Sequence, residues 1–284
     1  MKIKYLVKSS ENGYTIRQWS KLHFPLLSYQ KLQQHLRQKD ILSQHGKLSP
    51  QSILHTNDVL HVWQNIAQNN KSNLKELPLH TFQFVESRII EQTENFIVVN
   101  KPYDIASQGG TNIHISLIEV VNQWINYKNI AEKAYLVHRL DRCTTGVMIF
   151  ALNRNAATEF GETIHKWKKI YTAIIPKSEL QNQTKKHMIE VHERQIEAIT
   201  SHKIIRSNEQ YSIIELYPKT GRMHQLRQYC EQYLHPIIGD VRYGSKYKGK
   251  MQLHCTKISF SFLGKTFEFD APKPNHMQKL MNTI

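Results

Sequence analysis

The sequence predicts an α+β protein with a small N-terminal part and a larger part that begins near residue 82. In the larger part, apolar runs typical of strands outnumber amphipathic helical patterns. The polar stretch at 64–73 lacks apolar periodicity and indicates a linker, which we place at 64–81. The sequence contains neither internal repeats nor glycine-rich phosphate loops. We therefore divide the chain into residues 1–63, a linker at 64–81, and residues 82–284.

Strands and helices of the larger part follow from its hydrophobic pattern. Strands are predicted at 96–99, 147–152, 169–175, 187–193, 211–217, 251–262 and 266–270. Two amphipathic helices are predicted near 116–126 and 155–167. A third helix is expected to begin at Thr220, which would place Arg222 in its first turn.

The N-terminal part is predicted to contain one clear helix, a turn and a closing strand. Ser28 is a suitable N-cap for a helix that runs through about Lys39. Its apolar stripe, at helical spacing, is formed by Tyr29, Leu32 and Leu36. A turn follows at 45–46, and residues 58–63 alternate as a strand does. Lys31 and Arg37 on this helix are candidate RNA contacts.

Net charge favours a polyanionic partner. The chain carries 38 Lys and Arg against 23 Asp and Glu, a formal charge of +15. Residues 1–63 hold nine basic and three acidic residues, so +6 of that charge lies in less than a quarter of the chain. A basic chain attracts nucleic acid over long range, although acidic membranes and simple solubility also fit.

Other sequence features bear on location. No run of about 18 apolar residues is present, so no transmembrane helix is expected, and residues 1–30 lack the apolar stretch of a secretory signal. The three cysteines form no Cys-x-x-Cys pair, which favours a reducing compartment. We expect a cytoplasmic protein without a membrane partner.

One carboxylate stands out within residues 137–147. Asp141 lies between Arg139 and Arg142 and is followed by a polar turn at 143–146. Nearby guanidinium groups favour the ionised carboxylate, which is the form that a nucleophile needs. An ordinary ion pair in a surface loop is the alternative.

The same run resembles the central motif of the RluA family of pseudouridine synthases. That motif is His-Arg-Leu-Asp followed by a Thr-Ser-Gly turn. Here the turn is Thr144-Thr145-Gly146, so a threonine replaces the usual serine and keeps a hydroxyl at that position. Further family motifs match in the same order, at 96–102, 169–173, 220–227, 239–240, 243–244, 253–254 and 271–274. The resemblance covers roughly residues 82–274.

This resemblance implies a mixed, mainly antiparallel sheet with a cleft across its middle, and the isomerisation of uridine to pseudouridine in RNA. Asp141 would be the nucleophile and Arg222 its buried ion-pair partner. Tyr171 would stack on the uracil and is also a candidate for proton transfer. The reaction transfers no electrons and consumes no water, so neither a cofactor nor a metal is expected.

A nucleotide inside folded RNA must be flipped out before it is modified. By resemblance, Arg139 would fill the vacated space, with a phosphate contact as the alternative. Lys101 and Arg227 are expected to anchor backbone phosphates. His138 and His224 are interpreted as hydrogen-bonded structural residues. His187 and His192 lack metal-ligand spacing, since alternating strand positions would face opposite sides.

Within the family, two features favour an RluC-like enzyme that acts on large-subunit ribosomal RNA. Residues 107–110 resemble the Gly-Gly segment of that branch. The N-terminal pattern resembles a small α/β RNA-binding module shared by a small-subunit ribosomal protein and tyrosyl-tRNA synthetase, with an ordinary appendage as the alternative. A transfer RNA substrate and a non-catalytic RNA-binding assembly factor remain alternatives. A metal-dependent hydrolase would need clustered ligands that the sequence does not provide.

Overall fold

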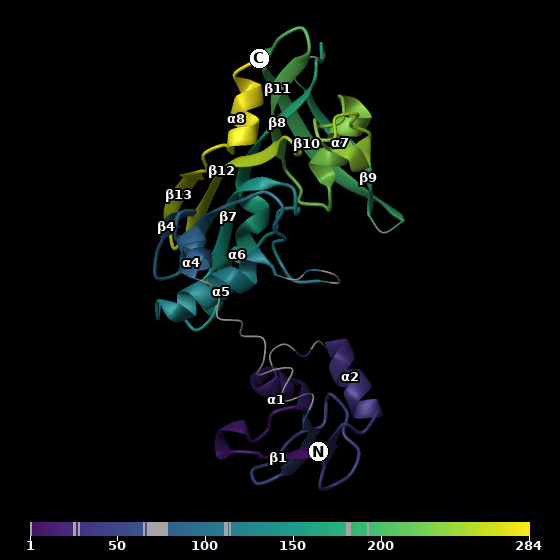
Figure 1. Cartoon of the computed structure of the whole chain (residues 1–284), viewed down its shortest axis with the longest axis vertical. Coiled ribbons are helices and arrows are strands. Elements are labelled where there is room, and N and C mark those ends of the chain that lie inside the picture. Colours follow the sequence, from purple (N-terminus) through teal and green to yellow (C-terminus); the bar gives the residue numbers. More distant parts are fainter. Residues whose placement is uncertain are drawn as a thin grey trace. The chain divides into compact units, whose positions relative to one another are not determined.

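The computed structural model describes residues 2–24, 27, 29–64, 66, 79–110, 113, 115–179, 183–191 and 193–284. The chain forms two compact units, Met1–Glu76 and Leu77–Ile284 (Figure 1). The predicted linker at 64–81, the predicted cap Ser28 and His192 lie largely or wholly outside the described residues. Helix α4 (Leu79–Glu86) begins inside the predicted linker.

The N-terminal unit is a small antiparallel sheet with helices. Its elements are β1 (Lys2–Leu6), η1 (Ser9–Glu11), α1 (Ile16–His23), α2 (Tyr29–Arg37), β2 (Ile41–Ser43) and β3 (Val59–Trp63), with strand order β1-β3-β2. Thr15 and Gln18 form a capping box that starts α1, a helix that the sequence did not predict. The one helix that the sequence predicts in this unit is confirmed as α2: Leu32 and Leu36 are buried, whereas Tyr29 is exposed beneath Arg17.

The described part of the larger unit contains one ten-stranded sheet, in the order β4-β5-β7-β12-β8-β11-β10-β9, with β6 on β7 and β13 on β12. The strands are β4 (Ile89–Gln92), β5 (Phe96–Lys101), β6 (Tyr135–Leu136), β7 (Thr145–Ala151), β8 (Lys168–Pro176), β9 (Gln183–Val191), β10 (Arg194–Ser207), β11 (Tyr211–Pro218), β12 (Leu253–Phe262) and β13 (Lys265–Asp270). Only β7 and β12 pair in parallel among these strands. The expected mixed, mainly antiparallel sheet is confirmed.

Helices cover this sheet in separate places (Figure 1). They are α5 (Leu117–Tyr127), α6 (Arg154–Thr163), α7 (Gln225–Tyr233) and α8 (Asn275–Met281), with short turns η2 (Ile164–Lys166) and η3 (Val241–Tyr243). Helix α7 packs against β9, β10 and β11. None of the helices in the described ranges is long and apolar enough to cross a membrane.

Strands β7, β12 and β8 form the middle of the sheet, and one glycine allows the first two to meet. Gly146 has a φ of +116°, and a Cβ there would lie 2.1 Å from the carbonyl oxygen of Cys255. The neighbouring Thr145 hydroxyl lies 2.7 Å from Nδ1 of His254. The Thr145 hydroxyl, which stands where the family motif has a serine, therefore forms a buried link between β7 and β12.

The third predicted helix begins later than expected. Helix α7 starts at Gln225, because His224 has a left-handed φ of 54° and interrupts the helical path. The side chain of Gln225 accepts hydrogen bonds from the Thr220 hydroxyl and the Arg222 backbone N–H. Arg222 therefore lies in a loop and not in a first helical turn.

Candidate active site

A cavity of about 500 Å³ opens beside the central strands of the larger unit. Three stretches of chain line it: residues 137–144, the segment from Ile164 to Tyr171, and the loop from Pro218 to Arg227. Five of the predicted site residues meet there: Arg139, Asp141, Tyr171, Arg222 and Arg227. The sequence motifs therefore converge on one site, although long stretches of chain separate them.

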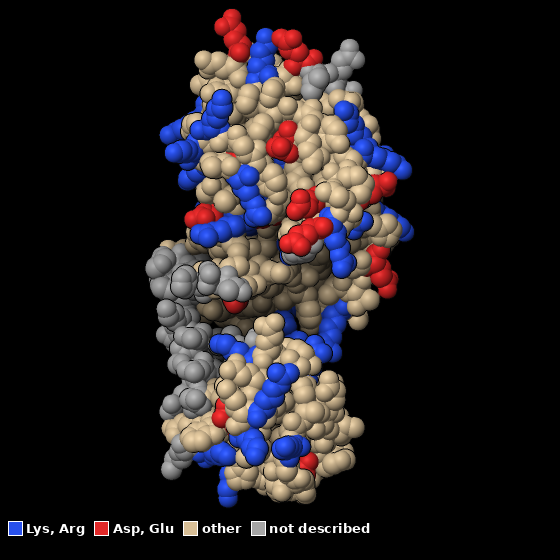
Figure 2. All heavy atoms as spheres, turned by 90° about the vertical axis from the view of Figure 1, so that its right-hand side faces the viewer, with Lys and Arg blue, Asp and Glu red and all other residues tan. Residues whose placement is uncertain are grey.

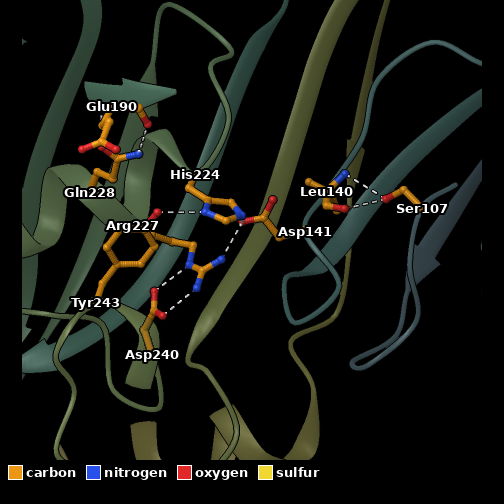
Figure 3. Close-up of polar contacts among 9 residues, drawn as sticks. All are labelled: Ser107, Leu140, Asp141, Glu190, His224, Arg227, Gln228, Asp240 and Tyr243. Atoms are coloured by element: carbon orange, nitrogen blue, oxygen red, sulfur yellow. Dashed lines mark hydrogen bonds and ion pairs between the residues drawn. The ribbon is translucent and has the colours of Figure 1, made fainter. Parts of the chain in front are cut away.

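Asp141 and Arg227 form the centre of the polar network (Figure 3). Nη1 of Arg227 donates to Oδ2 of Asp141 at 3.2 Å. Nε and Nη2 of the same guanidinium bind both carboxylate oxygens of Asp240, at 2.6 and 2.7 Å. Burial alone lowers the pKa of Arg227, but the hydrogen bonds and charges of Asp240 and Asp141 outweigh it and raise that pKa. Arg227 is therefore a permanent cation in a fixed orientation.

Two expected roles are corrected by this geometry. Arg222 is exposed and makes no ion pair among the described residues, so it is not the buried partner of Asp141. Arg227 was expected to anchor phosphate, yet its side chain is only 11% exposed and is occupied by two carboxylates. The helix start explains both errors, since α7 begins at Gln225 and directs Arg227 inward.

Asp240 is held in place by its own local structure. Its side chain is 2% exposed, and the preceding Gly239 has a φ of +84°. A Cβ on Gly239 would lie 2.4 Å from the carbonyl oxygen of Lys250, so only glycine fits there. The sequence placed Gly239 and Asp240 in a motif, but gave no sign that Asp240 orients Arg227.

The loop that carries Asp141 is fixed on both sides. Before it, the Ser107 hydroxyl donates to the Leu140 carbonyl at 2.6 Å and accepts from the Leu140 N–H at 3.0 Å (Figure 3). After it, the ammonium of Lys101 donates to the carbonyls of Arg142 and Thr144, at 3.0 and 2.8 Å, and to that of Pro102. These contacts restrict the backbone on which the carboxylate sits.

The expected phosphate role of Lys101 is therefore wrong. Its side chain is fully buried and lies outside the cavity lining. Burial lowers the pKa of Lys101 to about 8, with Cys143 and Asp141 acting in the opposite direction. Its three carbonyl acceptors make it a structural cation of the Asp141 loop.

Tyr171 lies on β8 opposite Cys255 of β12 and is 9% exposed. Burial raises the pKa of Tyr171 well above its usual value, and the nearby Cys255 and Asp141 raise it further. The phenol therefore stays protonated near neutral pH. It offers the cavity a flat ring and a proton donor, not a phenolate base.

Two histidines flank the site in different ways. His138 Nε2 accepts from the Ile149 backbone N–H at 3.0 Å, as expected for a structural histidine. His224 lies 2.8 Å from the Tyr243 hydroxyl and 3.9 Å from Asp141 Oδ2. Burial lowers the pKa of His224, although Asp141 acts in the opposite direction.

The arginines beside Asp141 in sequence are not its partners. Arg142 pairs with Asp104 at 2.8 Å, and both side chains are exposed. Arg139 is exposed and lines the cavity. The alternative of an ordinary loop ion pair among neighbours is therefore wrong, because the partner of Asp141 comes from helix α7.

Comparison with known proteins agrees with this site. Residues 95–232, which include Asp141, Tyr171 and Arg227, match the model of the RNA pseudouridylate synthase family. The chain resembles this family over those residues. It is an RNA pseudouridine synthase, an isomerase, and the RluA-family resemblance of the motifs is confirmed.

Relatives extend the likeness beyond the catalytic segment. A protein of Rickettsia prowazekii named ribosomal large subunit pseudouridine synthase C is 29% identical over 92% of this chain and 94% of its own length. One of the same name from Pasteurella multocida is 26% identical over 88% of this chain and 83% of its own. The structure of human RNA pseudouridylate synthase domain containing 4 shares the fold, with a TM-score of 0.62 and 21% identity over 71% of this chain and 94% of its own.

For a pseudouridine synthase, the site offers the carboxylate of Asp141, the fixed cation of Arg227 and the aromatic ring of Tyr171 around a cavity. In the described ranges, no group of three or more His, Cys, Asp or Glu side chains is placed to hold a metal ion. The expectation that neither metal nor cofactor takes part stays a prediction. A carboxylate held this way can attack a sugar carbon or stabilise charge that develops on it.

Proposed function

We propose that this chain isomerises specific uridines of large-subunit ribosomal RNA, with Asp141 as the nucleophile. The substrate assignment rests on the likeness to the Rickettsia prowazekii protein. The name of that protein specifies the large ribosomal subunit, and the match covers 92% of this chain. Such coverage includes much of the N-terminal unit as well as the catalytic one. A large part of residues 1–63 therefore has a counterpart in a protein named for that substrate.

The chemistry follows from the cavity. The bond between ribose C1′ and uracil N1 breaks, the ring rotates, and C1′ bonds to C5; the hydrogen on C5 leaves and N1 gains one. In this proposal Asp141 assists both bond changes while Arg227 holds its carboxylate in position. Tyr171 supplies the surface on which the uracil stacks, and its protonated hydroxyl is available as a donor.

RNA binding is assigned to exposed cations. Arg139 and Arg222 are exposed at the cavity, where Arg139 would fill the space left by the flipped nucleotide. On the N-terminal unit, Lys31 and Arg37 are exposed on α2. Figure 2 shows Lys and Arg side chains spread over that unit, with few acidic side chains in the same view. This distribution suits a phosphate backbone.

A cytoplasmic location accords with this proposal. All three cysteines, Cys143, Cys230 and Cys255, are free, as thiols remain in a reducing compartment. The ribosomal RNA substrate would be met in that compartment.

The experiment that tests the substrate is a map of pseudouridines in ribosomal and transfer RNA. Cells that lack the chain would be compared with cells that produce it or its Asp141→Asn variant. We expect sites in large-subunit ribosomal RNA that disappear without the chain and return only with the parent. Sites lost from transfer RNA alone would overturn the proposed substrate in favour of the transfer RNA alternative.

A further inference from the structure

Lys169 lines the cavity, and none of the steps described so far assigns it a role. It lies on β8 two residues before Tyr171, and both side chains line the cavity. Side chains alternate along a strand, so these two share a face, about 7 Å apart along the strand. Lys168 has the opposite orientation: it is exposed and lines a separate groove beside Ser259 and Phe260.

No described residue neutralises Lys169. Its ammonium makes no ion pair or hydrogen bond with the residues that the structure describes, and Nζ lies 5.7 Å from the centroid of the Trp167 ring. The other inner cations are satisfied, Lys101 by three carbonyls and Arg227 by two carboxylates. Burial lowers the pKa of Lys169, and the nearby Cys255, which acts in the opposite direction, does not offset that effect.

The reaction itself generates an anion inside this cavity. When the C1′–N1 bond breaks, its electron pair remains on the base, so the detached uracil is negatively charged. The charge spreads over the ring nitrogens and carbonyl oxygens until C5 bonds to C1′. Throughout the rotation the base therefore needs a cation that does not belong to the sugar or to Asp141.

We propose that the ammonium of Lys169 holds the detached uracil anion on Tyr171 while the ring rotates. The inference rests on the isomerase activity and does not depend on which RNA is modified. Uracil stacked on Tyr171 lies within reach of a lysine two positions along the same strand face. A cation in a partly desolvated cavity stabilises an anion far more than it does in water.

A phosphate role fits Lys169 less well than the exposed cations at the same cavity. Arg139, Lys219 and Arg222 are all exposed there, whereas Lys169 is partly buried beside the buried rings of Trp167 and Tyr171. The uncharged uracil of bound RNA gains little from an ammonium, and the detached anion gains much. The effect of Lys169 is therefore expected in the rate at saturation and not in affinity.

The test compares Lys169→Met, Lys169→Arg and the matched control Lys168→Met. The probe is total RNA, tritium-labelled at uracil C5, from cells that lack the chain; release of tritium measures isomerisation. We expect Lys169→Met to lower the rate at saturating RNA by about 100-fold. Its RNA affinity should stay within about threefold across a salt series, and Lys168→Met should match the parent. Lys169→Arg should keep at least about ten times the rate of Lys169→Met, since it keeps the charge.

Other outcomes overturn the proposal. An unchanged rate with weaker binding and a salt slope lower by about 0.7 would make Lys169 a phosphate contact. Unchanged rate and binding would leave it without a role in the reaction. Loss of folding in Lys169→Met would also contradict it, because removal of a buried unpaired charge should not destabilise the fold. No release by the parent chain would instead refute the isomerase activity proposed for the site.

Discussion

Asp141 and Arg227 are 86 residues apart in the sequence, and their side chains meet at 3.2 Å in the cavity. Arg227 reaches this position because Asp240 binds its other side with both carboxylate oxygens. Asp141, the proposed nucleophile, is thus oriented by a guanidinium that is itself oriented by the buried carboxylate of Asp240. Loss of Arg227 should therefore do more damage than loss of Arg222, although both belong to the motif at 220–227.

Arg227→Gln is expected to lower the rate at saturating RNA by at least about 100-fold, because Asp141 loses its fixed cation. It should also lower the free energy of unfolding by roughly 3–5 kcal/mol, because Asp240 is left as a buried charge without a partner. Arg222→Gln is the matched control from the same motif and should leave stability unchanged. Turnover and chemical unfolding of both variants check this. Greater damage from Arg222→Gln would contradict the assignment of Arg227.

Gly146→Ala should be severely destabilising, since the Cβ would lie 2.1 Å from the Cys255 carbonyl oxygen at a φ of +116°. We expect a loss of more than about 3 kcal/mol in the free energy of unfolding. Gly161→Ala in α6 is the control, because nothing lies within 4 Å of a Cβ there. Helical propensity predicts a gain of about 0.5–1 kcal/mol for it. Similar unfolding curves for the two variants would refute the close approach of β7 and β12.

Acid should destabilise the larger unit through His138. Burial lowers the pKa of His138 to about 3, from 6.5 when unfolded, so only the unfolded chain takes up a proton between these values. The contribution of neutral His138 to the free energy of unfolding is fully present above pH 6.5. It falls with pH, so that the free energy of unfolding is lower by up to about 2 kcal/mol at pH 5.

His138→Gln tests this, because the amide oxygen can still accept the Ile149 N–H but does not titrate. The difference in unfolding free energy between parent and variant should shift in favour of the variant as the pH falls from 7 to 5. A difference that stays constant over this range would show that His138 takes up a proton equally well in the folded and unfolded states, which would contradict the lowered pKa.

Removal of Lys31 and Arg37 together should weaken RNA binding and flatten its salt dependence. Each lost phosphate contact on single-stranded RNA lowers the slope of log K against log salt by roughly 0.7, so the double alanine variant should lose about 1.4. The control replaces Lys265 and Lys279, which are exposed on the larger unit, and removes the same charge. Rates at saturating RNA should not change in either variant. Equal slopes for the two pairs would mean that α2 is not the RNA anchor.

The sequence predicts correctly those strands and helices that a local hydrophobic pattern marks. The apolar run of β7, the helix after Ser116 and the stripe of Leu32 and Leu36 all lie where they were predicted. Strand β10 was missed, although it is 14 residues long, because its polar and charged residues give it no clear apolar run. Its place in the sheet comes from pairing with β9 and β11, which no local pattern reveals.

The sequence predicts which residues belong to the site, but it does not predict which of them are in contact. Motif order brought Asp141, Tyr171 and Arg222 into one predicted catalytic set and left Arg227 as a phosphate anchor. Which of the two arginines faces the carboxylate depends on where α7 starts. That start depends on the left-handed backbone of His224, which sequence periodicity does not predict. Burial of Lys101 likewise follows from the three carbonyls gathered around it and not from its neighbours in sequence.

Asp141→Asn shows whether the carboxylate of Asp141 performs the isomerisation. The amide keeps the shape of the side chain and removes its charge, so the tritium released from C5-labelled RNA should fall by about three orders of magnitude or more. RNA affinity should change by less than about tenfold, or 1.4 kcal/mol. A variant that binds RNA and still isomerises uridine at a rate close to that of the parent would contradict the account.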